Sequence, residues 1–213
     1  MRTGRPRGFC VEESLDRAMT VFWRHGYEGA SMSDLTSAMG INSPSLYACF
    51  GSKEGLFRAV LERYDERRKS FMESVLAADT AAKAAETYLH GIADFAIDTS
   101  GQNPPGCLLL QSGLSCGDSD IPDETARHRA EKEAALCDRF EKARKQGDLP
   151  KSASPEALAR YLMTVSNGIC VQAASGASAE ELHEVAAMAL MAWPAGNGKP
   201  PNPNSKKATA KVD

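Results

Sequence analysis

Residues 113–117 carry the pattern Gly-x-Ser-x-Gly, which in hydrolases places a nucleophilic serine, here Ser115, on a sharp turn between a strand and a helix. That chemistry also needs an acid and a histidine from later in the chain. Residues 108–110 are all leucine and could form a strand, but residues 118–122 are typical of a loop. Because no other segment predicts a sheet, a hydrolase using Ser115 is a remote alternative.

The other candidate chemical groups are six cysteines and four histidines. The cysteines have no Cys-x-x-Cys pair, and the histidines have no ligand spacing, so the sequence predicts neither a metal site nor a cofactor. A chain of 213 residues can bury a core without crosslinks, so we expect reduced thiols. Cys107, Cys137 and Cys170 are interpreted as small core residues.

The bulk properties are those of an ordinary globular protein, with 42% hydrophobic and 25% charged residues. A formal net charge of −3 excludes a generally basic protein that coats nucleic acid, but it permits a local basic patch. The first nine residues, MRTGRPRGF, are basic and lack the apolar core of a signal peptide. No apolar run is long enough to span a membrane, so a cytoplasmic location is expected.

Helical spacing of apolar residues dominates residues 11–193, and no alternating strand pattern is present, so the predicted fold class is all-α. The first helix should stop at Gly26. Ser31 caps a second, short helix that Gly40 ends, and Asn42 caps a third. Three short helices joined by tight turns predict a helix-turn-helix module.

The third helix has an unusual outward surface. Leu46 and Phe50 are four residues apart and define its core face, so Ala48 points directly away from the core. The outward residues are small or weakly polar, whereas a solvated helix face normally carries long charged side chains. This favours a docked surface, with serine hydroxyls on bases or phosphates and Pro44 or Ala48 against a thymine methyl group.

Phosphate contacts complete the predicted DNA surface. Tyr47 offers a hydroxyl, and Lys53 opens a helix whose free N–H groups attract anions. Basic residues before the first helix could enter the minor groove or form an unstructured tail, while Ser31 could act only as a cap and Lys53 could be merely solvated. The predicted DNA contacts are Arg5, Arg7, Ser31, Ser33, Ser43, Pro44, Ser45, Tyr47, Ala48 and Lys53.

Two segments resemble the DNA-binding domain of the TetR/AcrR family of transcriptional regulators. Residues 22–35 (FWRHGYEGASMSDL) resemble its first half, and residues 41–57 (INSPSLYACFGSKEGLF) its second half, with the Leu-Tyr-x-x-Phe and Ser-Lys-Glu elements intact. Residues 105–109 are similar to a segment in one branch of the family's sensor domains. Cys10 and Cys49 depart from the residue types common at those positions.

The resemblance implies a non-enzymatic, ligand-responsive regulator, most often a repressor, that binds a palindromic double-stranded DNA operator as a homodimer. We expect a basic arm (1–9), a helix-turn-helix domain (10–57), a helical sensing and dimerisation domain (58–193) and a disordered tail (194–213). The last two helices of each subunit would form a four-helix bundle, for which the candidates are Val165, Ile169, Val185, Ala189 and Leu190.

Two switches are compatible with this plan. The first is a small, mostly apolar effector held among the middle helices by Tyr88, Phe95, Leu110, Phe140, Met163 and Asn167, each of which could equally be plain core. The second is oxidation of Cys49, which we expect to lie partly exposed beside DNA.

Overall fold

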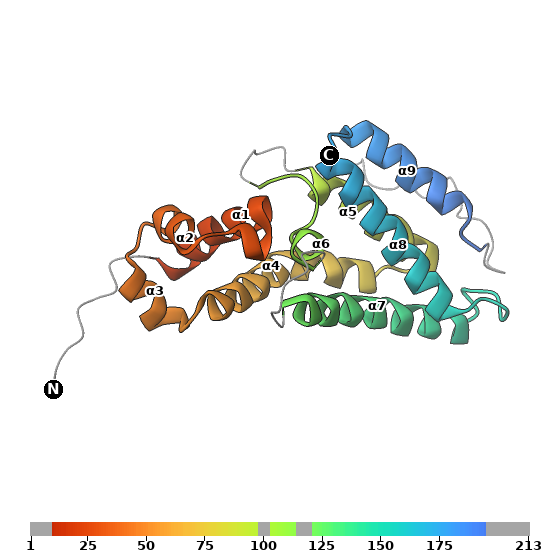
Figure 1. Ribbon diagram of the computed structural model, residues 1–213. Coiled ribbons are helices and arrows are strands. Elements are labelled where there is room, and N and C mark those ends of the chain that lie inside the picture. The colour runs from red at the N-terminus through yellow and green to blue at the C-terminus, as the bar shows by residue number, and fades with distance from the viewer. Residues whose placement is uncertain (1–9, 98–102, 114–120, 195–213) are drawn as a thin grey trace, which may run out of the picture.

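The computed structural model describes residues 10–97, 103–113 and 121–194, and within these ranges the regular structure is helical, without strands (Figure 1). The helices are α1 (Val11–Gly29), α2 (Met32–Met39), α3 (Ser43–Phe50), α4 (Lys53–Leu76), α5 (Ala81–Ala96), α6 (Leu108–Gly113), α7 (Ile121–Lys145), α8 (Pro155–Ala174) and α9 (Ala179–Met191). The predicted all-α class is confirmed.

The helix starts of the N-terminal unit follow from their capping residues. Ser31 Oγ accepts a hydrogen bond from the Asp34 backbone N–H at 3.1 Å, and the Asp34 carboxylate accepts the Ser31 N–H in return. Asn42 Oδ1 accepts from Ser45 N at 2.9 Å. Each cap satisfies a backbone donor that has no partner inside its helix, as the sequence predicted.

The predicted stop at Gly26 corresponds to a break inside α1. Gly26 has φ 68° and ψ 176°, and a short continuation reaches Gly29. A second glycine, Gly55, allows α3 and α4 to meet closely, because a Cβ at this position would lie 2.1 Å from the carbonyl oxygen of Phe50. The corner between α3 and α4 therefore requires a residue without a side chain.

The first hydrophobic core lies among α1, α2, α3 and the first half of α4. Phe22, Leu35, Leu46 and Phe57 are fully buried there, and the rings of Phe22 and Phe57 meet edge to face at 4.9 Å. This core continues along α4 and also contains Leu108 and Leu109 of α6 and Ile121 of α7. Elements from the second half of the chain thus pack directly on the N-terminal unit.

The second core holds α5, α7, α8 and α9 together with the end of α4. In Figure 1, α4 runs from the corner with α3 into this bundle, and α9 lies on its outer side. Leu89, Leu136, Phe140 and Leu162 are fully buried within it. Among the described residues, no helix combines the length and apolar character needed to cross a membrane.

Candidate functional site

The outward face of α3 is an exposed surface of short side chains. Ser43, Pro44, Tyr47 and Ala48 are exposed, and Tyr47 retains 50% of its accessible area. Ser45 is half-buried, and Leu46 is completely buried beneath it. The backbone of α3 can therefore approach a partner closely, with hydroxyl groups as the polar contacts.

Lys53, at the start of α4, is held in place and not freely solvated. Its ammonium donates a hydrogen bond to the carbonyl oxygen of Glu28 at 3.4 Å and lies 4.6 Å from the centre of the Tyr27 ring. Burial lowers the pKa of Lys53 from its ordinary value. The neighbouring Ser52 hydroxyl caps α4 by accepting from Gly55 N at 3.0 Å.

The serines at the start of α2 differ in what they can offer. The Ser31 hydroxyl is already engaged with Asp34, to which it donates at 2.5 Å, whereas Ser33 is exposed. Arg5, Arg7 and Ser115 lie outside the described residues. Cys49, the predicted redox site, is half-buried on α3.

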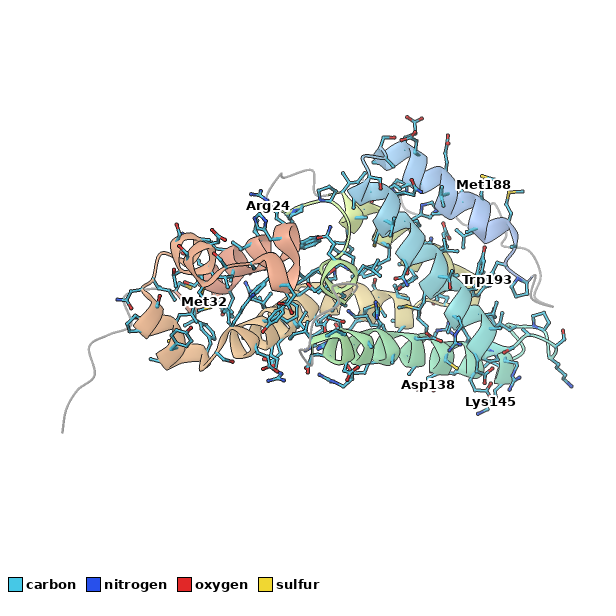
Figure 2. The ribbon with its side chains drawn as sticks, viewed as in Figure 1. Arg24, Met32, Asp138, Lys145, Met188 and Trp193 are labelled. Atoms are coloured by element: carbon cyan, nitrogen blue, oxygen red, sulfur yellow. The ribbon has the colours of Figure 1, made fainter. Side chains whose placement is uncertain are left out.

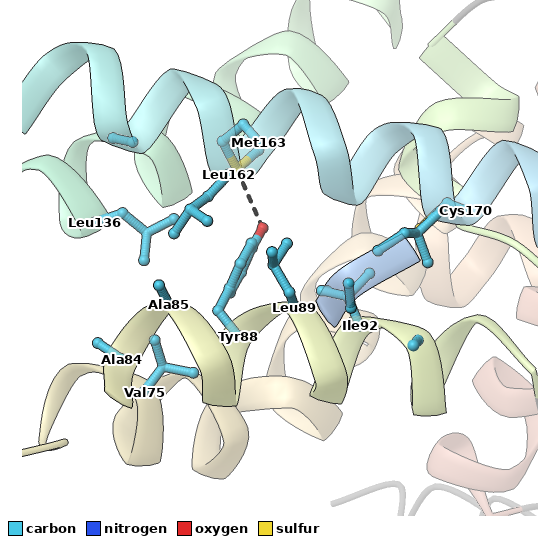
Figure 3. Close-up of a cluster of buried hydrophobic side chains, with 14 of the residues drawn as sticks. Val75, Ala84, Ala85, Tyr88, Leu89, Ile92, Leu136, Leu162, Met163 and Cys170 are labelled. Carbon is cyan, nitrogen blue, oxygen red and sulfur yellow. Dashed lines mark hydrogen bonds between the residues drawn. The ribbon is translucent and has the colours of Figure 1, made fainter. Parts of the chain in front are cut away.

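The predicted pocket residues divide into two groups. Tyr88, Leu110, Phe140 and Met163 are packed in the second core, as the close-up in Figure 3 illustrates for Tyr88 and Met163. The Tyr88 hydroxyl donates to Met163 Sδ at 3.2 Å, and burial raises the pKa of Tyr88 to about 12. Asn167 is half-buried on α8, and only Phe95 of the six lines the cavity described next.

That cavity lies where α1 meets α4 and the end of α5, and its volume is about 380 Å³. Trp23 comes from α1, Tyr64 and Arg68 from α4, and Phe95 from α5. The volume falls within the range of small-molecule sites, roughly 300–1,000 Å³. The sequence missed it because its walls come from segments far apart in the chain, including the helix-turn-helix unit.

A polar cluster lies beside this cavity. Cys107 Sγ is 3.3 Å from the Tyr64 hydroxyl. A hydrogen bond from the buried Cys170 thiol, aided by the charge of Arg68 and by Tyr64, holds the pKa of Cys107 well below its ordinary value despite burial. The same pairing, with burial, raises the pKa of Cys170. Cys170 lies in the second core and Cys107 and Cys137 pack against it, as predicted, and Cys107 and Cys170 also interact with each other.

The histidines show no ligand spacing along the sequence, but the structure brings three of them against side chains of other helices. The Nδ1 atoms of His90 and His183 are 2.8 Å apart, and His183 Nε2 is 2.9 Å from an Asp94 carboxylate oxygen. His128 Nδ1 contacts Asp65 at 2.5 Å. Spacing along the chain could not reveal these pairs, since each joins two different helices.

Four large apolar side chains on α8 and α9 are exposed. Val171, Val185, Met188 and Met191 are 50%, 44%, 70% and 85% exposed. Figure 2 shows Met188 projecting away from the bundle. We call these four residues the α8–α9 patch.

The predicted interface residues overlap this patch only at Val185. Ile169 is 1% exposed and lies in the chain's own core, while Val165, Ala189 and Leu190 are partly buried against that core. Helix α9 therefore carries large apolar side chains on its outer side as well as on its inner side. The sequence periodicity identified the inward face but, apart from Val185, missed the exposed apolar residues.

Comparison with known proteins shows what kind of molecule carries these features. Residues 15–60 match the family described as bacterial regulatory proteins, tetR family. The chain is 36% identical over 195 residues to the HTH-type transcriptional repressor ComR of Escherichia coli K12, covering 90% of this chain and 92% of ComR. It is 31% identical over 188 residues to the repressor BdcR of the same organism, covering 87% and 90%.

Solved structures agree with the sequence relatives. A cysteine mutant of the TetR family regulator CifR, complexed with 26-base-pair operator DNA, has a TM-score of 0.84 and 37% identity, covering 89% of this chain and 100% of that chain. An all-α chain with this helix-turn-helix unit is a DNA-binding transcriptional regulator and not an enzyme. It belongs to the TetR family.

Proposed function

We propose that the protein is a homodimeric repressor that binds a palindromic operator through α3 and is released by a small molecule. The observation that carries the proposal is the outward face of α3, where Ser43, Pro44, Tyr47 and Ala48 are exposed beside the N-terminus of α4. Short side chains let the helix enter a major groove, and free N–H groups at a helix start attract phosphate. The relatives ComR and BdcR are named repressors, and CifR binds operator DNA.

The proposed DNA contacts have distinct roles. Ser43, Ser45, Pro44 and Ala48 face the base edges, whereas Tyr47 and Lys53 face phosphates. We retain Ser33, Arg5 and Arg7 as proposed backbone or minor-groove contacts and assign Ser31 mainly to capping. In a dimer the two α3 helices must be one DNA turn apart, about 34–36 Å.

The α8–α9 patch supports the dimer. Its exposed methionines and valines are costly to leave in water, and a second copy of the same patch would cover them. The proposed domain division at residues 57 and 58 places this patch in the sensing and dimerisation domain. The DNA-binding unit would then be held at a fixed distance from its copy through α4.

Operator selection tests the proposal. The full-length protein is incubated with random 30-base-pair duplexes, and bound DNA is enriched, sequenced and footprinted. We expect a palindrome whose half-sites are centred one turn apart, bound by two subunits. If no sequence is enriched over the starting pool, or if one subunit binds a single half-site with full affinity, the proposal is wrong.

A thiol switch is the second candidate function. Its reactive group would be Cys107 in place of Cys49, because Cys107 contacts the Tyr64 hydroxyl and has a lowered pKa. In such a switch, the Cys107 thiolate would attack one oxygen of hydrogen peroxide, so that an S–O bond forms as the O–O bond breaks, giving a sulfenic acid and releasing hydroxide. The test compares operator release by hydrogen peroxide in the wild type, Cys49→Ser and Cys107→Ser. If only Cys107→Ser abolishes release by peroxide, Cys107 is the reactive thiol. If Cys49→Ser abolishes it, the reactive thiol is Cys49 on α3.

A further inference from the structure

We infer that the cavity between α1, α4 and α5 binds a small aromatic carboxylate, with the acid group on Arg68 and the indole N–H of Trp23. This inference rests on the proposed release by a small molecule and names the ligand class and its site. The cavity differs from the core positions among which the sequence placed the effector.

The first observation is a buried hydrogen-bond donor without an acceptor. Trp23 is only 4% exposed, it lines the cavity, and its Nε1 atom has no partner among the described residues. A buried unsatisfied donor typically costs about 1–3 kcal/mol. A ligand oxygen in the cavity would remove that cost, so the site favours molecules that carry an acceptor.

The second observation is the environment of Arg68. Its guanidinium lies 4.4 Å from the centre of the Tyr64 ring and 5.1 Å from that of Phe95. Among the residues that the structure describes, no carboxylate forms an ion pair with it. A half-buried guanidinium stacked between aromatic rings presents its N–H groups in a fixed fork that matches a carboxylate.

The other charged groups at the cavity have partners of their own. Arg67 is 3.7 Å from Asp16, and Asp94 is 2.9 Å from His183. Cys107 is the protein group whose pKa the charge of Arg68 helps to lower. Among the described residues, no acceptor forms a hydrogen bond with Arg68, so its N–H groups are available to a ligand. The variant Cys107→Ser tests this assignment directly.

The walls define the rest of the ligand. Trp23 and Tyr64 meet edge to face at 5.4 Å, and Phe95 on the opposite helix is 39% exposed. Flat aromatic walls beside the unpaired cation Arg68 select a planar ring that bears an acid. Because Trp23 belongs to α1 and Phe95 to α5, such a ligand contacts both units at once. It would therefore bind differently to any state in which α1 moves relative to α5.

Isothermal titration calorimetry with a matched probe pair tests the inference. The full chain is titrated with 2-naphthoate and with 2-naphthamide, which have the same ring but differ in charge. We expect naphthoate to bind at least tenfold more tightly than the amide. Arg68→Met should abolish this preference, Arg68→Lys should preserve most of it, and Trp23→Phe should weaken naphthoate severalfold. Arg67→Met is the control on the same helix and should retain the preference.

The outcomes are decisive in both directions. Equal binding of the two probes, absence of binding heat, or a preference that survives in a folded Arg68→Met protein would overturn the inference. A preference for naphthoate that increases in Cys107→Ser would show that the Cys107 side chain competes for Arg68, and an unchanged preference would show that it does not. Both results agree with the carboxylate site. Operator affinity of each ligand-free variant is measured in parallel. If the wild type binds operator but not naphthoate, only the pocket assignment is refuted. If the wild type does not bind operator, the proposed function is refuted.

Discussion

The outward faces of α3 and α9 are both exposed, yet their side chains suit different partners. The α3 face has short residues with hydroxyls and lies beside a helix N-terminus and Lys53. The α9 face has the long thioethers of Met188 and Met191. A face of short hydroxyls next to positive charge suits a polyanion, whereas flexible apolar side chains suit another apolar surface. On α3 the missing charges indicate a docked surface, and on both helices the exposed side chains and their neighbours indicate the kind of partner.

Placing charge on the α9 face should have the largest effect. In the variant Met188→Glu/Met191→Glu, two carboxylates per subunit would be buried without partners, at a cost of about 3–5 kcal/mol or more. We expect monomers in sedimentation velocity and a loss of operator affinity of over 100-fold. Val165 and Leu190 are poorer test sites because they pack against the chain's own core.

The matched control is Ala82→Glu, which adds a carboxylate at an exposed position on α5. It should leave both the sedimentation coefficient and operator binding unchanged. If the double variant still sediments as the wild type does, the α8–α9 patch is not the dimer surface.

Removing a hydroxyl from the α3 face should have an intermediate effect. Tyr47→Phe keeps the ring and deletes one proposed phosphate contact, so operator affinity should fall by about 1 kcal/mol, roughly fivefold. Tyr47→Ala should lose more. Fluorescence anisotropy with a labelled operator measures both, and equal affinity of the three proteins would show that Tyr47 does not touch DNA.

The salt dependence of operator affinity tests whether Lys53, beside the α3 face, contacts a phosphate. Lys53→Met keeps the apolar stem against Tyr27 and removes the charge, so the slope of log affinity against log salt should decrease by about one unit. Lys69→Met, farther along α4 with its side chain 61% exposed, is the control and should leave the slope unchanged. Identical slopes for all three proteins would assign Lys53 to holding α1 against α4 and not to DNA.

The N-terminal unit could be predicted in detail because its information is local. Caps such as Ser31 and Asn42 and stops such as Gly26 act within four residues, and the TetR-like motif lies in the same segment. The roles proposed for its DNA contacts remain predictions. The cavity could not be predicted, since Trp23 and Phe95 meet only through tertiary packing.

The exposed methionines of α9 were not predicted from the sequence, for a different reason. Periodicity locates the most hydrophobic stripe of a helix, and in α9 that stripe faces the chain's own bundle. The outward methionines Met188 and Met191 lie off the stripe, so only their exposure reveals them. The same limitation hid the His90–His183 pair, which joins α5 to α9.

Removing a capping serine should have the smallest effect. The two capping boxes are Ser31 with Asp34 on α2 and Ser178 with Glu181 on α9. Removing either serine hydroxyl frees a backbone donor, so Ser31→Ala and Ser178→Ala should each lower the free energy of unfolding by about 1 kcal/mol. Urea unfolding at fixed protein concentration measures both. Operator affinity should fall slightly in Ser31→Ala alone, because α2 positions α3 in the groove.

The pH dependence of Ser31→Ala provides the final check on this box. The hydrogen bond from the Ser31 side chain lowers the pKa of Asp34, so the folded state binds this proton less tightly than the unfolded state does. That contribution to stability is present above the ordinary aspartate pKa, about 3.9, and is lost as the pH falls through the lowered pKa of the folded state. The difference between wild type and Ser31→Ala should therefore stay constant from pH 7 to pH 5 and narrow only below about pH 4. A difference that already shrinks between pH 7 and pH 5 would show that another group controls the cap.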